Sequence, residues 1–139
     1  MEPVIDIGCG KSGRIVKYLR SKGIAAFGLD RLNLPNDVFF IRGSWFEYNF
    51  EKDHWGSVIS NMGFANHFVG NHLRKDGNYI EYAEKYNEIL NALKIGGSFY
   101  YAPGLPFIEQ YLSKDRFVVD NEAIHGKINL TRSIVRKIK

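Results

Sequence analysis

The chain has 139 residues, of which 45% are hydrophobic and 24% are charged, and its formal net charge is +4. This length predicts one domain, residues 1–139, that buries roughly two-thirds of the surface exposed by the unfolded chain. The apolar runs are too short to cross a bilayer, and the first residues lack the pattern of a secretory signal, so we expect no membrane association. One cysteine excludes a disulfide framework and suits a reducing compartment, so we expect a cytoplasmic protein.

The first half of the chain predicts three strands and one helix. PVIDIG is a short apolar run that ends in glycine, as expected for a strand buried on both faces. The segment 13–22 predicts a helix in which Ser12 is the N-cap and Gly23 ends the last turn. The connection after the second strand contains a proline and has no room for a helix of ordinary length. The predicted strands are residues 3–8, 24–30 and 38–43.

The second half predicts two more parallel strands and a closing antiparallel hairpin. Residues 62–78 predict a loop-rich segment, and residues 79–93 place apolar side chains at helical spacing before the turn KIGG. Two β-rich segments flank a polar loop with Gly126, which indicates the hairpin. The expected fold is α/β, with an open, mostly parallel sheet and an antiparallel C-terminal end. The remaining elements are strands at 56–61, 98–104, 116–121 and 128–138, and a short helix at 106–112.

The segment DIGCGKSGR, between the first strand and the first helix, fits three different ligand patterns. A phosphate-binding loop would need a glycine where the chain has Ile5, and a strand runs into the turn, so this pattern fails. A dinucleotide-binding turn fits better, because Gly8, Gly10 and Gly13 have its spacing between a strand and a helix. Asp30, at the end of the second strand, is placed to hold two ribose hydroxyls. Any adenosyl ligand offers that diol, so these residues alone leave the ligand open.

Asp6 favours the third pattern, the D-x-G-x-G turn of S-adenosylmethionine sites. Its carboxylate lies at the end of the first strand, close to whatever the glycines hold. It would repel a pyrophosphate, whereas it would attract the sulfonium and ammonium groups of S-adenosylmethionine. The alternative is that Asp6 only caps the turn. For Cys9 we expect a small residue in a tight turn rather than a reactive thiol.

Taken together, these motifs resemble the class I S-adenosylmethionine-dependent methyltransferases, especially those that act on small molecules. VIDIGCG is similar to the first motif, GLDR to the acidic ribose motif, and WGSVISNMGFANHF to the fourth strand and its loop. EILNALKIGGSFYYAPG resembles the helix, the L-K-P-G-G turn and the fifth strand of the family. The resemblance covers nearly the whole chain and implies a Rossmann-like fold, S-adenosylmethionine as the methyl donor and no metal.

The resemblance also implies which residues surround the cofactor, at the carboxyl ends of the strands. Ser44 stands where the family often has an acidic residue for the adenine amino group. Trp45 beside it could stack on the adenine or belong to the core. Gly56 replaces an aspartate that commonly begins the fourth strand. The expected cofactor-binding residues are Asp6, Gly8, Cys9, Gly10, Asp30, Ser44, Trp45 and Asn61.

The sequence looks like a minimal version of this family. It begins immediately before the first predicted strand, so the N-terminal cap helices of the family have no counterpart in it. The helix between the second and third strands has none either. We therefore expect a single S-adenosylmethionine-binding domain over residues 1–139, with the site edge exposed, which is compatible with a homodimer.

The loop after the fourth strand is expected to receive the methyl acceptor. This loop holds Asn61, Phe64, Asn66, His67, Phe68 and His72. His67 matches a histidine that small-molecule methyltransferases often carry there, and it could accept a proton. The alternative is a structural histidine bonded within the loop. The favoured function is direct methyl transfer to a small molecule. The rival is a domain that binds the cofactor without methylating alone, as a partner subunit or a degenerate paralogue.

A nucleic-acid substrate is not expected. SNMGF resembles the N-P-P-F/Y motif of methyltransferases that act on amide or ring nitrogens, but Met62 and Gly63 replace both prolines. The C-terminal stretch has five basic residues and no acidic one, which is more typical of a solvated strand edge than of a nucleic-acid site. We therefore expect a small-molecule partner.

Overall fold

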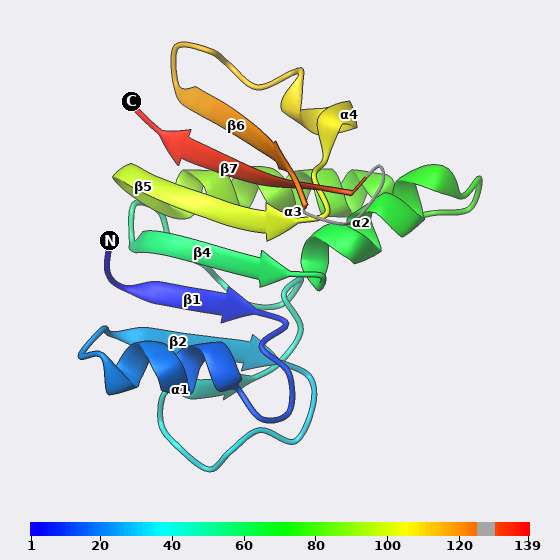
Figure 1. The fold of residues 1–139 in the computed structure, drawn as a ribbon. Coiled ribbons are helices and arrows are strands. Elements are labelled where there is room, and N and C mark those ends of the chain that lie inside the picture. Colours follow the sequence, from blue (N-terminus) through cyan, green and yellow to red (C-terminus); the bar gives the residue numbers. More distant parts are fainter. Residues whose placement is uncertain (125–129) are drawn as a thin grey trace.

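The computed structural model describes residues 1–124 and 130–139, which form a seven-stranded sheet with helices on both faces (Figure 1). The strand order is β3-β2-β1-β4-β5-β7-β6. The predicted polar loop with Gly126 lies outside the described residues. The strands are β1 (Val4–Ile7), β2 (Ala26–Asp30), β3 (Phe40–Arg42), β4 (Trp55–Asn61), β5 (Leu93–Ala102), β6 (Phe117–Ala123) and β7 (Thr131–Lys137). The helices are α1 (Arg14–Ser21), α2 (Phe64–Leu73), α3 (Tyr79–Ala92) and α4 (Pro106–Glu109).

The pairing of the strands confirms the expected fold class. β1 pairs in parallel with β2 and β4, and the parallel order continues to β3 on one side and to β5 on the other. β7 runs antiparallel to both β5 and β6. The order of the strands therefore changes direction between β1 and β4, and ligands of open α/β sheets bind at such a point, beyond the carboxyl ends of the strands.

Helix α1 begins after a left-handed glycine. Gly13 is the N-cap residue, with φ 58° and no side-chain cap, so the predicted capping by Ser12 is wrong. A Cβ atom on Gly13 would lie 2.3 Å from the Phe40 ring, so the helix approaches the sheet edge too closely for any other residue. At the other end, Gly23 has φ 78° and its N–H donates to a carbonyl of the last turn, which confirms the predicted helix stop.

The contact between Gly13 and Phe40 predicts a measurable loss of stability. Gly13→Ala is expected to lower the free energy of unfolding by about 2–4 kcal/mol, since it adds a left-handed alanine to an overpacked contact. Gly23→Ala is the matched control, because Gly23 also has a positive φ but a Cβ atom there meets nothing within 4 Å. This control should cost only about 1 kcal/mol in urea denaturation. Equal losses for the two variants would show that the contact does not matter.

The connection between β2 and β3 carries no helix, as the sequence predicted. The Arg20 guanidinium lies 3.9 Å from the centre of the Phe39 ring, and its Nε donates to Ala26 O at 2.6 Å. These contacts tie α1, β2 and the connection together. β3 is shorter than the predicted strand 38–43, because Val38 lies 98% exposed in the turn that precedes it.

The segment 62–78 is not loop-rich, and the prediction for it was wrong. It contains the ten-residue helix α2. Phe64, Ala65 and Phe68 are buried on one side of this helix and supply the apolar stripe that stabilises it. Gly70 and the asparagines around it lower the helix propensity of the segment, so tertiary packing outweighs local preference here.

Helix α3 runs directly into β5. The predicted helix 79–93 is confirmed over Tyr79–Ala92, but the expected turn KIGG is part of β5 instead. Gly96 has φ 87°, and the pairing of β4 with β5 shifts register between Trp55 and Ser57. The two glycines that the sequence pattern assigned to a turn therefore lie in an irregular part of β5, where the strand forms a bulge.

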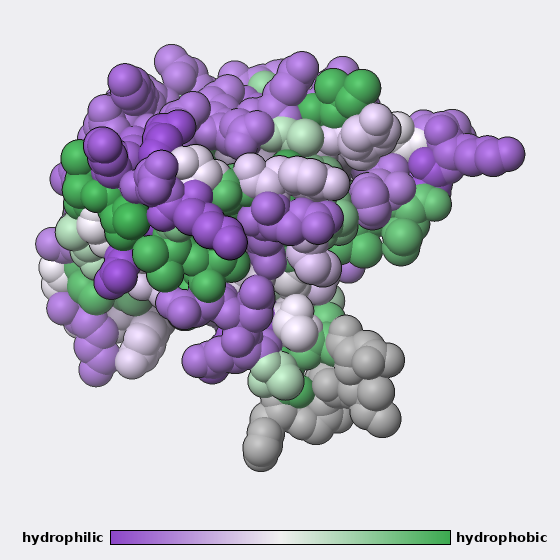
Figure 2. All heavy atoms as spheres, turned by 90° about the horizontal axis from the view of Figure 1, so that it is seen from above, coloured by the Kyte–Doolittle hydropathy of each residue, from purple (hydrophilic) through white to green (hydrophobic). Residues whose placement is uncertain are grey.

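The helices divide between the two faces of the sheet. α1 packs on β1 and β2, whereas α2 and α3 contact β4 and β5 from the opposite face (Figure 1). The connection between α2 and α3 projects past the carboxyl ends of the strands, and its tip is hydrophilic (Figures 1 and 2). The switch point at the end of β1 thus lies between α1 on one side and the start of α2 on the other.

A buried carboxylate fixes the C-terminal hairpin to the rest of the sheet. Glu109 Oε2 accepts hydrogen bonds from the Tyr101 hydroxyl at 2.5 Å, the Leu105 N–H at 2.8 Å and the Ser133 hydroxyl at 2.7 Å. The network joins β5, α4 and β7. Lys137 is likewise buried and donates to Asp53 at 2.7 Å, so the basic C-terminal stretch is not wholly solvated, contrary to the prediction.

Candidate functional site

A glycine loop links β1 to α1 at the switch point of the sheet. Gly8 and Gly10 both have φ 78°, a conformation that favours glycine over other residues. The N–H groups of Gly8 and Cys9 donate to Leu29 O at 2.7 and 3.2 Å. The loop is therefore held against the end of β2, with glycine backbone facing the space above the sheet.

Two cavities of about 250 Å³ each lie on either side of Gly8. One opens beside Asp6 and Asn61, and the other beside Asp30 and Trp45. A ligand that lies across the loop can therefore occupy both. The first cavity is lined by Asp6, Gly8, Cys9, Ser12, Arg14, Ile15 and Asn61. The second is lined by Gly8, Asp30, Arg31, Leu32, Gly43, Trp45, Gly63 and His67.

Asp30 lies at the carboxyl end of β2, as the sequence predicted. Its Oδ2 accepts a hydrogen bond from the Gly10 N–H at 2.9 Å, and its Oδ1 accepts one from the Leu32 N–H at 3.2 Å. The Asp30 carboxylate thus stabilises the conformation of the glycine loop. Each carboxylate oxygen keeps a second lone pair, so Asp30 can still accept hydrogen bonds from a ligand in the second cavity.

Asp6 is a buried acid without a full set of partners. Only 2% of its surface is exposed, and its Oδ1 makes no hydrogen bond with the described residues. Burial, assisted by the negative charge of Asp30, raises the pKa of Asp6 to about 7. Unsatisfied buried carboxylates are costly, and a cation in the first cavity would offset the cost. Asp6 thus lines the first cavity and has a buried oxygen that makes no hydrogen bond with the described residues.

Cys9 fits its expected structural role. The side chain is half-buried, and a Cβ atom on Gly28 of β2 would lie 2.8 Å from its Sγ. Burial, with the nearby Asp6 and Asp30 charges, raises the pKa of the Cys9 thiol to about 12. The thiol stays protonated near neutral pH and is a weak nucleophile.

Trp45 and His67 meet in the second cavity. Their ring centres are 5.6 Å apart, and Trp45 also packs edge-on against Phe64 at 5.6 Å. Trp45 thus lines the cavity and also packs at the border of the core. This position is compatible with both alternatives drawn from the sequence, namely contact with adenine and a place in the core. Ser44 is turned away, since its hydroxyl accepts a hydrogen bond from the Phe46 N–H at 3.1 Å, and it is not among the lining residues.

His67 lies on α2 rather than in a loop. Its recorded hydrogen bonds use only its backbone, with the N–H donating to Gly63 O and the carbonyl accepting from Asn71. The imidazole is exposed on the cavity that holds Asp30. No loop contact of the kind expected for a structural histidine fixes the ring among the described residues.

Other aromatic residues assigned to an acceptor loop have different places. Phe64 and Phe68 are 0% and 1% exposed and pack against Tyr82, so a substrate cannot reach them. The His72 ring stacks on Phe107 with centres 3.8 Å apart. The segment expected to be an acceptor loop is therefore a helix that turns Phe64 and Phe68 to the core.

Several residues that line the cavities were not among the expected site residues, and Arg14 and Gly63 are two of them. Arg14, in the first turn of α1, lines the cavity of Asp6. Gly63 lines the other, and its Cα would lie 3.5 Å from a Cβ atom on Gly8. The adjacent parallel strands β1 and β4 end side by side, so their following residues meet. This adjacency of β1 and β4 could have predicted that Gly63 lies at the site. For the exposed Arg14, the only indication in the sequence was its position directly after the glycine loop.

The described residues show neither a metal cluster nor a membrane helix. No group of three or more His, Cys, Asp or Glu side chains among residues 1–124 and 130–139 could hold a metal ion. None of the helices in that part of the chain combines the length and apolar character needed to cross a membrane. The charged and titratable side chains that line the two cavities are two aspartates, a histidine, a cysteine and two arginines.

Solved structures place this architecture among known folds. A putative methyltransferase from Streptococcus mutans in complex with SAH matches 99% of this chain and 87% of its own, with 16% identity and a TM-score of 0.66. An rRNA methylase from Streptococcus thermophilus matches 99% of this chain and 88% of its own, with 13% identity and a TM-score of 0.65. The fold is that of the class I S-adenosylmethionine-dependent methyltransferases.

Similarity in sequence is more limited. A chain from the complex between the Haloferax volcanii Trm112 methyltransferase activator and the putative methyltransferase is 28% identical, with a TM-score of 0.51. The match covers 71% of this chain but only 43% of the Haloferax one, so this chain spans less than half of that protein. Neither a protein-family model nor a curated protein matches the sequence. The methyltransferase fold is thus identified from structure, and the acceptor is not.

Proposed function

We propose that residues 1–139 act as a single S-adenosylmethionine-binding domain that transfers a methyl group to a small-molecule acceptor. The observation that carries the proposal is the unpaired Oδ1 of Asp6, buried on a cavity beside the glycine loop. S-adenosylmethionine has a sulfonium and an ammonium cation, whereas the pyrophosphate of a dinucleotide would add negative charge beside Asp6 and Asp30. The Coulomb interaction with Asp6 and Asp30 therefore favours the first ligand.

The two cavities fit the two halves of this cofactor. Asp30 would hold the ribose hydroxyls and Trp45 would contact the adenine, both in the second cavity. Asp6 and Asn61 would receive the cationic end in the first cavity. Gly8, Cys9 and Gly10 would let the backbone approach between them, because glycine adds no side chain there. Ser44, with its hydroxyl engaged in a turn, would contribute backbone or shape only.

The reaction requires little from the chain beyond positioning the acceptor and the methyl donor. S-adenosylmethionine supplies, when bound, a methyl group activated by a positively charged sulfur. The chain has to hold the acceptor in line with that group and exclude water, an effect that can reach ~7–11 kcal/mol. Asn61 borders the first cavity and is the residue placed to orient an acceptor there. A base is needed only for acceptors that lose a proton.

His67 is proposed as that base. Its imidazole is exposed at the second cavity, on the other side of Gly8 from Asn61, and it makes no side-chain hydrogen bond with the described residues. His67→Ala is expected to lower kcat about 100-fold for an acceptor that loses a proton, while the Kd for S-adenosylmethionine changes less than about threefold, since no ionic contact is lost. His72→Ala, which removes a ring stacked on Phe107, is the control. Full turnover in the His67 variant would exclude the role.

The class of acceptor can be tested directly. S-adenosylmethionine labelled in its methyl group is incubated with the protein and with separate small-molecule, RNA and protein fractions of a cell extract. Label that depends on the protein is expected in the small-molecule fraction. Label in the RNA fraction alone would replace the proposed acceptor with nucleic acid and would leave the cofactor assignment standing.

A second candidate is a domain that binds the cofactor but methylates only with a partner. Two observations favour it. The similar Haloferax chain comes from a complex with a methyltransferase activator, and no helix of residues 1–124 and 130–139 covers β4 and β5 on the face that carries α1. Calorimetric binding of S-adenosylmethionine without label transfer to any fraction would favour this candidate over the first.

A further inference from the structure

Helix α1 begins beside the first cavity with unpaired backbone donors. Its N-cap residue, Gly13, supplies no side-chain cap, and the first turn contains no acidic residue. The Lys17 N–H donates to Gly13 O at 3.0 Å, so the N–H groups of Arg14, Ile15 and Val16 have no partner inside the helix. Arg14 and Ile15 both line the first cavity. The start of α1 thus places backbone donors and the positive end of a helix dipole beside this cavity.

The Arg14 side chain adds a full positive charge to the same side of the cavity. It is exposed at the first position of α1, and it forms no ion pair with residues 1–124 or 130–139. The dipole of a helix disfavours a cation at its N-terminus, so Arg14 does not stabilise α1 in the ligand-free chain. A guanidinium can instead hold a carboxylate through two parallel hydrogen bonds.

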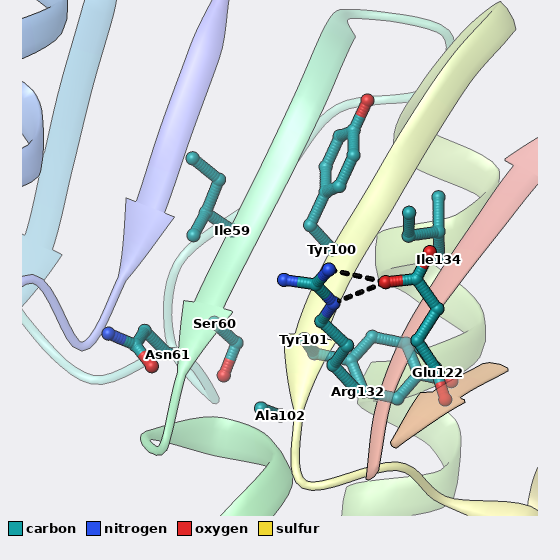
Figure 3. Close-up of a pocket in the computed structure, with 10 residues that line it drawn as sticks. Ile59, Ser60, Asn61, Tyr100, Tyr101, Ala102, Glu122, Arg132 and Ile134 are labelled. Carbon is teal, nitrogen blue, oxygen red and sulfur yellow. Dashed lines mark hydrogen bonds and ion pairs between the residues drawn. The ribbon is translucent and has the colours of Figure 1, made fainter. Parts of the chain in front are cut away.

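The first cavity also has a negative side, formed by Asp6 at the end of β1. Asp6 is 2% exposed, and its Oδ1 makes no hydrogen bond with the described residues. Burial and the charge of Asp30 raise the pKa of Asp6, and no cation of the described chain lowers it. Asn61 lines the cavity from the end of β4, on the side of β1 (Figure 3). The charges of Asp6 and Arg14 thus line one cavity of about 250 Å³ without neutralising each other.

We propose that the first cavity recognises a zwitterionic α-amino acid group, with Arg14 and the start of α1 holding the carboxylate and Asp6 holding the ammonium. Asp6 would repel an isolated anion, and Arg14 would repel an isolated cation. A group that carries both charges on one carbon atom fits both sides of the cavity. The inference rests on the proposed function, because S-adenosylmethionine ends in such a group. It makes Arg14 the residue that selects ligands with a carboxylate.

Three adenosyl ligands test the inference by titration calorimetry of the full chain at pH 8. S-adenosylmethionine carries the complete amino acid group. Its decarboxylated form keeps the sulfonium and the ammonium and lacks only the carboxylate, whereas methylthioadenosine lacks the whole amino acid group. We expect the wild type to bind S-adenosylmethionine at least about tenfold more tightly than the decarboxylated form. Equal affinities for these two ligands would overturn the inference and leave the proposed function standing.

Variants of α1 assign the discrimination to Arg14. Arg14→Gln is expected to weaken the binding of S-adenosylmethionine about tenfold, and to bind the decarboxylated form no more weakly than the wild type does. Arg14→Lys keeps the charge without the planar fork and should restore part of the loss.

The matched control is Lys17→Gln, at an exposed position of the same helix. It makes the same change in net charge and should leave all three affinities within about twofold of the wild type. Equal losses in Arg14→Gln and Lys17→Gln would show an effect of net charge alone and would overturn the role of Arg14.

A purely structural role of Arg14 predicts a different result. Because its charge opposes the helix dipole, Arg14→Gln should leave the melting temperature of the ligand-free chain unchanged or slightly higher. A lower melting temperature together with equal losses for all three ligands would show that Arg14 only supports the glycine loop, and this would overturn the proposal. A wild type that binds none of the three ligands would contradict the proposed function and this inference together.

Discussion

Replacing Asp6 with asparagine is expected to make the protein more stable at pH 8 and at the same time to weaken its binding of S-adenosylmethionine. The carboxylate is buried with an unpaired oxygen, so its charge costs free energy in the ligand-free state. The neutral amide removes that cost, by about 1–3 kcal/mol at pH 8. It also removes the charge that attracts a cation, with a loss of affinity of about 1–3 kcal/mol.

The pH dependence of the wild type follows from the same shift. Burial raises the pKa of Asp6 from its ordinary value of 3.8 to about 7, so between these two values the folded state keeps a proton that the unfolded state releases. Stability from this group is fully present below pH 3.8, falls as pH rises towards 7, and then stays level. Affinity for S-adenosylmethionine should rise over the same range, because the cation binds the ionised form.

Urea denaturation and calorimetry at pH 5 and pH 8 measure both effects. The stability gain of Asp6→Asn should shrink at pH 5, where the wild-type side chain is already mostly protonated in the folded state. Asp120→Asn, at an exposed position of β6, is the control and should change neither quantity. A variant that is less stable than the wild type at pH 8, or that binds the cofactor equally well, would contradict the role given to Asp6.

Asp30→Ala is expected to cost about 1.5–3 kcal/mol of S-adenosylmethionine affinity, through loss of charge-assisted hydrogen bonds to the ribose. The variant also frees the Gly10 N–H, which Asp30 now binds at 2.9 Å, and a loss of about 1 kcal/mol in stability should accompany it. Titration calorimetry and urea denaturation separate the two losses.

The control for this variant is Asp37→Ala. Asp37 is an exposed carboxylate in the same connection between β2 and β3, and its removal changes the net charge equally. It should leave both the affinity and the stability within experimental error of the wild type. Unchanged affinity in Asp30→Ala would exclude the ribose contact. Equal losses of affinity in both variants would show that the effect comes only from the change in net charge.

The sequence predicted the order and type of the strands because each is a short apolar run bounded by glycine, proline or polar residues. The buried runs around Ile5 and Val58 are of this kind. It did not predict helix α2. Gly70 and the neighbouring asparagines give that segment the composition of a loop, and only the packing of Phe64 and Phe68 against Tyr82 makes a helix favourable there.

The site was predictable where backbone geometry and charge decide it. Glycines at positive φ and a carboxylate at a strand end leave a pattern in the sequence, so Gly8, Gly10 and Asp30 could be named. The direction in which a side chain points leaves no such pattern in the sequence. Ser44 is turned into a local hydrogen bond, and Arg14 reaches a cavity from an exposed helix turn. Both depend on contacts that form only in the folded chain.

The central claim is that the glycine loop holds S-adenosylmethionine, and calorimetric titration of the purified chain tests it most directly. Parallel titrations use S-adenosylmethionine and NAD at pH 8, where Asp6 is ionised. The account predicts micromolar binding of S-adenosylmethionine and none of NAD. Binding of NAD without S-adenosylmethionine would mean that the buried carboxylate does not select a cation, and the proposed methyltransferase function would fall with it.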